Sequence, residues 1–170
     1  MQNSSFVDFT LNYNKFKKPL FNYVLKIVKS EMFAEDIVHN VFLNLYNNLS
    51  LIRNPERIEI WIFTTARNEV FSHFRKNKNK NEENIEQYEN KIDTCNIVEE
   101  YERQELIKFI EIELNKMDIS QNEIYYLKEY SDLSYKEIAG ILDITEDLVR
   151  SRIFKVRQKL KDAIKKLYKD

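Results

Sequence analysis

The chain has 170 residues, of which 43% are hydrophobic, and a formal net charge of −1. A domain usually takes ~100 to 200 residues, so this length accommodates one or two small hydrophobic cores. With one glycine and two prolines the chain lacks the residues that strand turns need, which argues against a β-rich protein and predicts an all-α fold.

Cysteine content and hydropathy indicate the cellular compartment of the protein and whether it enters a membrane. A lone cysteine, Cys95, excludes an internal disulfide framework and is typical of a reducing compartment. The first residues lack the basic flank and apolar run of a signal peptide, and no stretch approaches the ~20 apolar residues of a membrane span. We therefore expect a cytoplasmic protein without membrane insertion.

The N-terminal part reads as two amphipathic helices. Residues 6–29 repeat apolar side chains at helical spacing, but Pro19 predicts a break near residues 17–19. Residues 33–49 have the most regular pattern in the chain, with apolar residues at alternating intervals of one and three. The predicted inward stripe of this second helix is Phe33, Ala34, Ile37, Val38, Val41, Phe42, Leu45, Tyr46 and Leu49, and Leu43 is an apolar residue outside it.

A loop and a basic aromatic helix follow. Asn54 precedes Pro55, a position that disfavours helix, so residues 50–57 are predicted to be a loop. The next helix, from about residue 56 to 76, mixes aromatic side chains with cations. Bases can stack on rings while Lys and Arg meet phosphates, so this mixture suits single-stranded nucleic acid, although we expect about two thirds of the aromatics to serve packing.

An acidic segment divides the chain. Residues 82–105 hold nine Asp and Glu against two Lys and Arg, a net charge of −7, and residues 77–97 lack apolar periodicity. Such a composition is typical of a flexible linker. We predict helical domains at residues 1–78 and 103–170, joined by a linker at 79–102.

The C-terminal part predicts a helix-turn-helix unit. A capping box at residues 120–123 predicts the start of one helix, and a second box at residues 134–137 predicts another. Thr145 caps a further helix, with Leu148, Val149, Ile153, Val156 and Leu160 as its inward stripe. Residues 145–170 hold nine Lys and Arg against four Asp and Glu, a net charge of +5, which favours a nucleic-acid partner.

Catalytic patterns are missing from the sequence. The two histidines are far apart, and HExxH, CxxC, GxSxG and glycine-rich phosphate loops are absent. We expect no enzyme activity, no metal site and no cofactor.

Three stretches in this order resemble bacterial RNA polymerase sigma factors of the extracytoplasmic-function type, which belong to the sigma-70 family and have only sigma domains 2 and 4. They are AEDIVHNVFLNL from Ala34, WIFTTARNEVFSHFRK from Trp61 and LSYKEIAGILDITEDLVRSRIFKVRQKLK from Leu133. The resemblance implies a protein that binds core RNA polymerase and directs initiation at promoters with minus-ten and minus-thirty-five elements.

The resemblance also implies roles for particular residues. Asp36, Asn40 and Leu43 would bind the clamp helices of the largest polymerase subunit, and domain 4 would meet the flap region. The minus-ten element would be held by Arg53, Asn54, Trp61, Arg67, Asn68 and Arg75. The minus-thirty-five element would be read by Arg150, Ser151 and Arg152, with Lys155 and Arg157 on phosphates. Family members often have an anti-sigma factor as a further partner.

Two residues depart from the family pattern, and two other classes of protein are alternatives to a sigma factor. Asp143 and Asp147 stand where the family commonly has glycine or a small neutral residue, which places negative charge near the groove-facing end of the reading helix. A free-standing helix-turn-helix regulator, acting without polymerase, is the main alternative. A helical adaptor that binds only proteins is the other, and the clusters of cations argue against it.

Overall fold

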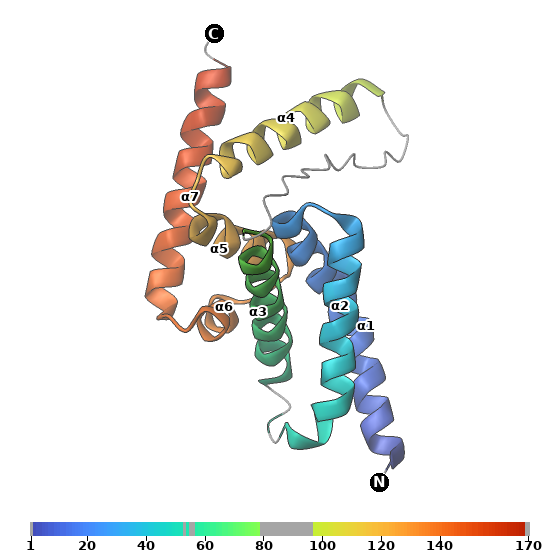
Figure 1. Cartoon of the computed structure of the whole chain (residues 1–170). Coiled ribbons are helices and arrows are strands. Elements are labelled where there is room, and N and C mark those ends of the chain that lie inside the picture. Colours follow the sequence, from blue (N-terminus) through green and yellow to red (C-terminus); the bar gives the residue numbers. More distant parts are fainter. Residues whose placement is uncertain (1, 53, 55–56, 79–96, 169–170) are drawn as a thin grey trace.

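The computed structural model describes residues 2–52, 54, 57–78 and 97–168, with side chains described for 8–49, 51, 52, 54, 57–75 and 103–168. Within these residues the regular structure is helical: α1 (Gln2–Val28), α2 (Glu31–Asn48), the 3-10 turn η1 (Leu49–Leu51), α3 (Ile58–Lys78), α4 (Ile97–Asn115), α5 (Ile119–Tyr130), α6 (Tyr135–Leu142) and α7 (Glu146–Leu167) (Figure 1). The all-α prediction is confirmed. Because α4 begins at Ile97, the end of the predicted linker 79–102 is helical, and Cys95 lies outside the described residues.

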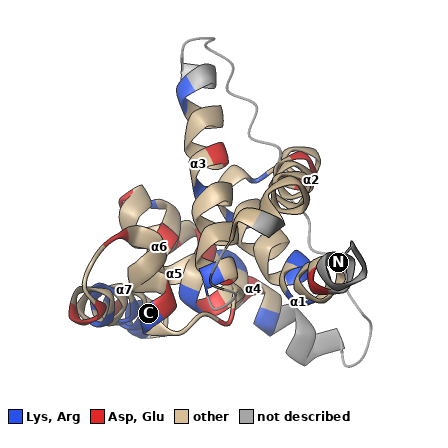
Figure 2. Cartoon of the chain, turned by 90° about the horizontal axis from the view of Figure 1, so that it is seen from below, with Lys and Arg blue, Asp and Glu red and all other residues tan. Residues whose placement is uncertain are grey.

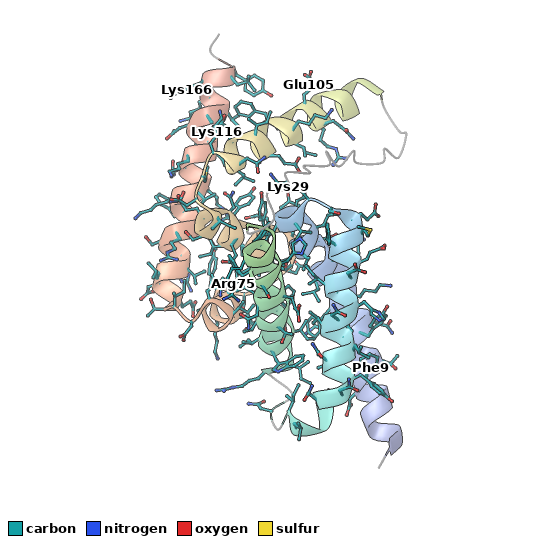
Figure 3. All side chains as sticks on the ribbon, viewed as in Figure 1. Phe9, Lys29, Arg75, Glu105, Lys116 and Lys166 are labelled. Atoms are coloured by element: carbon teal, nitrogen blue, oxygen red, sulfur yellow. The ribbon has the colours of Figure 1, made fainter. Side chains whose placement is uncertain are left out.

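The helices α1, α2 and α3 pack on one another around a shared core. The regular pattern of α2 explains its burial, since Ala34, Ile37, Val38, Val41, Phe42 and Leu45 all lie inside. The prediction fails at the ends of the stripe, where Phe33 is 38% and Tyr46 57% exposed. The Tyr46 ring meets the Phe9 ring edge-on, with centroids 5.3 Å apart, and Phe9 lies toward the N-terminal end of α1 (Figure 3).

The predicted break at Pro19 is wrong, because α1 continues through it. Proline removes one backbone donor and crowds the preceding turn, which usually ends or kinks a helix. Here Phe16 lies buried before Pro19, and Leu20, Tyr23 and Val24 lie buried after it. Tertiary packing on both sides therefore holds the helix together across a residue that local propensity disfavours.

The helices α5, α6 and α7 form a second packed group, which α4 joins through α7. The inward stripe of α7 is confirmed at Val149, Ile153, Val156 and Leu160. Leu148 was wrongly included in that stripe, since it is 39% exposed in the first turn of the helix.

The junction between α6 and α7 follows the predicted caps. The Ser134 hydroxyl accepts from the Glu137 amide, and the Glu137 carboxylate accepts from the Ser134 amide at 2.7 Å, so the capping box is complete. Thr145 Oγ1 accepts from the Leu148 amide and starts α7. Asp143 ends α6 in the left-handed conformation, with φ at 54°, which aspartate tolerates better than most residues. Asp143, at a position that commonly holds glycine, is therefore accommodated as the C-cap of α6.

The capping box expected at residues 120–123 is not formed. The helix α5 begins at Ile119 with Asp118 at its N-cap, so Ser120 lies inside the first turn. Glu123, the other member of the expected box, is 3% exposed and bonded elsewhere in the chain. The Glu123 side chain therefore forms a tertiary interaction instead of the capping interaction that the local pattern predicts.

The two groups of helices touch each other directly. The helix α1 contacts α5, α3 contacts α6, and the buried apolar residues of both groups form one continuous cluster. At the α3–α6 contact the chain's glycine, Gly140, faces Ile60, and a Cβ placed there would lie 2.8 Å from Ile60 Cδ1. Glycine allows the two helices this close approach. No helix among the described residues is long and apolar enough to cross a membrane.

Removing the Ser134 hydroxyl tests the capping assignment. Ser134→Ala should lower the free energy of unfolding by about 1 kcal/mol, because the first turn of α6 loses an acceptor for the Glu137 amide. Ser120→Ala is the matched control, and it should change stability by less than about 0.5 kcal/mol because Ser120 lies inside α5. Urea unfolding of both variants measures the difference, and equal losses would contradict the assigned helix starts.

Candidate polymerase and nucleic-acid interfaces

One face of α2 is exposed and of mixed polarity. Asp36, Asn40 and Leu43 lie three or four residues apart, so they share one side of the helix, and Leu43 is 50% exposed. Met32, 63% exposed, continues this side by one turn. An apolar side chain among polar ones, opposite a buried stripe, provides a surface suited to a separable protein contact.

A hollow opens beside the start of α3. It is lined by Asn48, Leu51, Ile52, Asn54, Arg57 and Trp61 and has a volume of about 560 Å³. It is an open depression in the surface, accessible from solvent. Trp61 is partly buried against the core, so its ring both supports the fold and borders the hollow. Arg53 lies outside the described residues.

The remaining minus-ten candidates divide between two sides of α3. Trp61, Asn68 and Arg75 follow one another at intervals of seven, which keeps them close to one line along the helix, and Asn68 and Arg75 are exposed. Arg75 lies near the C-terminal end of α3 (Figure 3). Arg67 points elsewhere, toward α5.

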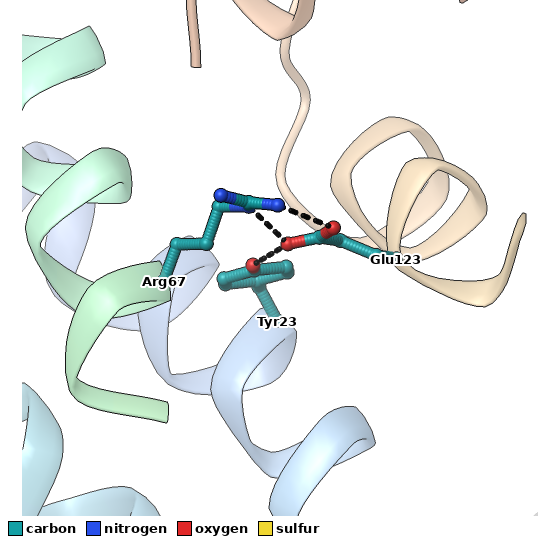
Figure 4. Close-up of polar contacts among 3 residues, drawn as sticks. All are labelled: Tyr23, Arg67 and Glu123. Atoms are coloured by element: carbon teal, nitrogen blue, oxygen red, sulfur yellow. Dashed lines mark hydrogen bonds and ion pairs between the residues drawn. The ribbon is translucent and has the colours of Figure 1, made fainter. Parts of the chain in front are cut away.

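Arg67 is part of a polar cluster at the contact between α1, α3 and α5 (Figure 4). Its Nε donates to Glu123 Oε1 at 2.7 Å, and its Nη2 donates to Oε2 at 3.4 Å. The Tyr23 hydroxyl donates to the same Oε1 at 3.1 Å. Burial, and then the neighbouring Glu123 carboxylate, raise the pKa of Tyr23 well above its usual value, so the phenol keeps its proton and remains a donor. The Arg67 guanidinium also lies over the Phe71 ring at 4.9 Å.

The outer side of α7 carries several of the minus-thirty-five candidates. Helical spacing places Ser151 and Lys155 opposite the buried stripe, and both are exposed. Arg150 and Arg157 flank this side, and Arg152 is half-buried beside the stripe. Figure 2 shows Lys and Arg along α7 together with acidic residues. The helix thus places most of its cations away from its buried stripe, as its pattern predicts.

The flanking arginines of α7 are held by neighbours. Arg150 Nη2 is 2.5 Å from Glu146 Oε1, and its guanidinium lies over the Tyr135 ring at 5.0 Å. Arg157 donates to Glu129 of α5 at 2.6 Å. Exposed pairs of this kind contribute only about 0–1 kcal/mol, so a phosphate or a base edge could replace the carboxylates. Asp147 is exposed on the contact side of the first turn, where the helix N-terminus favours negative charge.

Sequence reasoning missed one prominent residue on this side. Phe154 is 63% exposed and lies three and four residues after Ser151 and Arg150. A large apolar side chain outside the inward stripe of a basic helix was the signal that could have identified it. Phenylalanine can contact the methyl group of thymine in a major groove.

Metal-binding clusters of three or more His, Cys, Asp or Glu are absent from the described part of the chain. The features found there are exposed surfaces: a mixed face on α2, a hollow beside Trp61, a polar line on α3 and a basic outer side of α7.

Two family profiles match the chain. Sigma-70 region 2 matches residues 13–80, and Sigma-70 region 4 matches residues 113–160. The first covers α2, α3 and most of α1, and the second covers α5, α6 and most of α7.

Curated relatives match along almost the whole chain. The ECF RNA polymerase sigma factor SigM of Bacillus subtilis is 26% identical over 153 residues, which cover 88% of this chain and 90% of SigM. The RNA polymerase sigma-H factor of Pseudomonas aeruginosa is 23% identical and covers 95% of this chain and 89% of its own length.

Two solved structures share the fold. The sigma factor RpoE of Bartonella quintana, solved with the anti-sigma factor NepR, superposes with a TM-score of 0.72 at 19% identity and covers 93% of this chain and 97% of its own. CnrH, solved with the cytosolic domain of CnrY, gives 0.66 at 20% identity, covering 92% and 87%. With both sigma-70 regions in order and relatives aligned over almost its full length, the chain belongs to the extracytoplasmic-function group of the sigma-70 family and is an RNA polymerase sigma factor that acts in promoter recognition.

Proposed function

We propose that three surfaces of this sigma factor divide the work of initiation. The exposed face of α2 binds the polymerase, the hollow and polar line of α3 hold the minus-ten element, and the outer side of α7 reads the minus-thirty-five element. The observation that carries this division is the segregation of α7, whose buried stripe lies opposite Ser151, Phe154 and Lys155. A helix-turn-helix inserts the second helix of the pair into the major groove in this orientation.

At the minus-thirty-five element, Arg150 is the main candidate for a base contact. It lies in the second turn of α7, and residues near this end of a recognition helix reach the base edges. Ser151 and Phe154 lie on the same side, with Lys155 and Arg157 on phosphates. Arg152 is half-buried, which leaves it a smaller share of the contact.

At the minus-ten element, the hollow offers a place for an unstacked base. Asn54 and Arg57 supply polar groups at its rim, and Trp61 supplies an aromatic face. A base taken out of a stack is held by such stacking and by hydrogen bonds to its edge. Asn68 and Arg75 continue the path along α3, and Arg53 remains a candidate from the sequence alone.

For the polymerase, Asp36, Asn40 and Leu43 would meet the clamp helices of the largest subunit, and the region 4 group would meet the flap. The chain would act by binding, in the cytoplasm where the polymerase works, and the polymerase would supply the chemistry. A similar fold, RpoE, was solved with the anti-sigma factor NepR, which supports an anti-sigma factor as a further partner of this chain.

Initiation with core polymerase tests the proposal, and Arg150 tests its base-reading part. Purified chain and core polymerase should start transcription at promoters carrying both elements, whereas the free-standing regulator would bind duplex DNA without initiation. Arg150→Ala should reduce discrimination between matched and mismatched minus-thirty-five elements by roughly 5- to 150-fold, the equivalent of ~1 to 3 kcal/mol for a bidentate contact to a base.

The matched control is Lys165→Ala, in the last turn of α7, which should leave selectivity unchanged. Unaltered selectivity in Arg150→Ala, measured by competition between promoter sequences, would remove Arg150 from the reading set.

Leu43→Asp tests the polymerase surface. Leu43 is half exposed, so a charge there should change the stability of the free chain by about 0.5 kcal/mol or less. It should weaken binding to core polymerase at least about tenfold, because a charge would be buried in an apolar contact. Asn14→Asp, which adds the same charge on an exposed position of α1, is the control. Equal affinities of the two variants for polymerase would contradict the assignment of α2.

A further inference from the structure

The first turn of α7 carries two carboxylates that have different surroundings. Glu146 Oε1 is 2.5 Å from Arg150 Nη2, so the charge of Glu146 is paired within the helix. Asp147 is exposed, and its carboxylate has no hydrogen bond or ion pair to any residue that the structure describes. One of the two carboxylates is therefore engaged with a neighbour, and the other is available to a partner outside the chain.

Asp147 lies on the outer side of α7. It comes four residues before Ser151 and seven before Phe154, so the three side chains share the side opposite the buried stripe of the helix. In a helix-turn-helix, the residues near the start of the second helix are the ones that reach base edges. The Asp147 carboxylate therefore lies where the proposed minus-thirty-five contact is made.

A negative charge at this place opposes binding to DNA unless it gains a hydrogen bond there. Duplex DNA carries one negative charge per ~1.7 Å of its length, and these phosphates repel a carboxylate. The carboxylate also gives up bound water when it enters the groove. The dipole of α7 does not compensate for these losses, because it stabilises the Asp147 charge in the free chain as well. Binding therefore needs a donor on the DNA that faces Asp147.

The donors on base edges in the major groove are the N4 amino group of cytosine and the N6 amino group of adenine. Adenine presents its N7 acceptor beside the amino group, and this acceptor repels the second carboxylate oxygen. Guanine and thymine present acceptor atoms to the groove and no amino group. A carboxylate on the reading side of a helix is thus best satisfied by cytosine and is disfavoured by guanine and thymine.

We propose that Asp147 is a specificity residue that selects cytosine within the minus-thirty-five element, in the base pair that Arg150 contacts or in the pair next to it. The inference rests on the proposed function, which places α7 in the major groove. Asp147 and Arg150 are three residues apart on the helix, a spacing of about 5–6 Å between Cβ atoms, against ~3.4 Å per base-pair step. Their side chains therefore reach the same pair or adjacent pairs.

Asp147 selects partly by rejection. A residue discriminates between sequences either by a favourable contact with the correct one or by an unfavourable contact with the wrong one, and a carboxylate does both. Removal of the carboxylate should therefore weaken binding to the correct sequence relative to the others and strengthen binding to sequences that lack the amino group. A carboxylate that only stabilises the first turn of α7 would affect all promoter sequences equally.

Competition between promoters tests this proposal in the complex of the full chain with core polymerase. Each position of the minus-thirty-five element is varied in turn. The unaltered chain should prefer cytosine over guanine or thymine by at least about fivefold at one position. Asp147→Ala should lose this preference and bind the guanine and thymine promoters several-fold more tightly than the unaltered chain. Asp147→Asn should shift the preference to adenine, because an amide can bond both N6 and N7 of that base.

Asp162→Ala is the matched control. Asp162 is exposed on the same helix fifteen residues later, which is about 22 Å along the axis at ~1.5 Å per residue. This variant removes the same charge from α7 beyond the reach of those base pairs, so it should leave each base preference unchanged.

A cytosine preference that persists in both Asp147 variants would overturn the inference. The same holds for an affinity change in Asp147→Ala that is equal for all sequences, and for a preference by the unaltered chain that does not include cytosine. A complex without any base preference in the minus-thirty-five element would instead contradict the proposed function of α7. The two failures are therefore distinguishable in one experiment.

Discussion

The Glu123 carboxylate is buried, and a buried charge must find partners. Its partners are Arg67 and Tyr23, from helices more than fifty residues earlier in the chain. This requirement fixes how α5 sits against α1 and α3, and the apolar contact between Ile60 and Gly140 continues the same interface along α6. The relation between the two sigma regions therefore depends on this ion pair and its supporting phenol together with the apolar cluster that both groups share.

The helices α2 and α7 have the same arrangement of buried and exposed side chains. In α2 and α7 a stripe of apolar residues faces the core, while polar and isolated apolar side chains remain outside. Leu43 and Phe154 are the exposed apolar members, 50% and 63% exposed. Single apolar side chains among polar ones suit protein contacts that form and separate.

Local patterns predicted much of this structure, and long-range contacts explain most of what they missed. The buried part of the α2 stripe from Ala34 to Leu45, the Ser134 capping box and the Thr145 cap are set by neighbours in sequence, and these were predicted. The continuity of α1 through Pro19 depends on packing against other helices, and the place of Glu123 depends on Arg67. The residues proposed for DNA and polymerase came from resemblance, and their roles remain predictions; Asp143 shows that a departure from that pattern can be absorbed by a left-handed cap.

The position of α7 on promoter DNA, measured in the complex with core polymerase, is the most direct test of the proposed division of surfaces. A photoreactive cross-linker attached at Ser151→Cys, in a Cys95→Ser chain, lies on an exposed position opposite the buried stripe of α7. We predict cross-links to the minus-thirty-five element and none to the minus-ten element, because the outer side of α7 faces the DNA. Cross-links to the minus-ten element, or none to promoter DNA, would contradict the account.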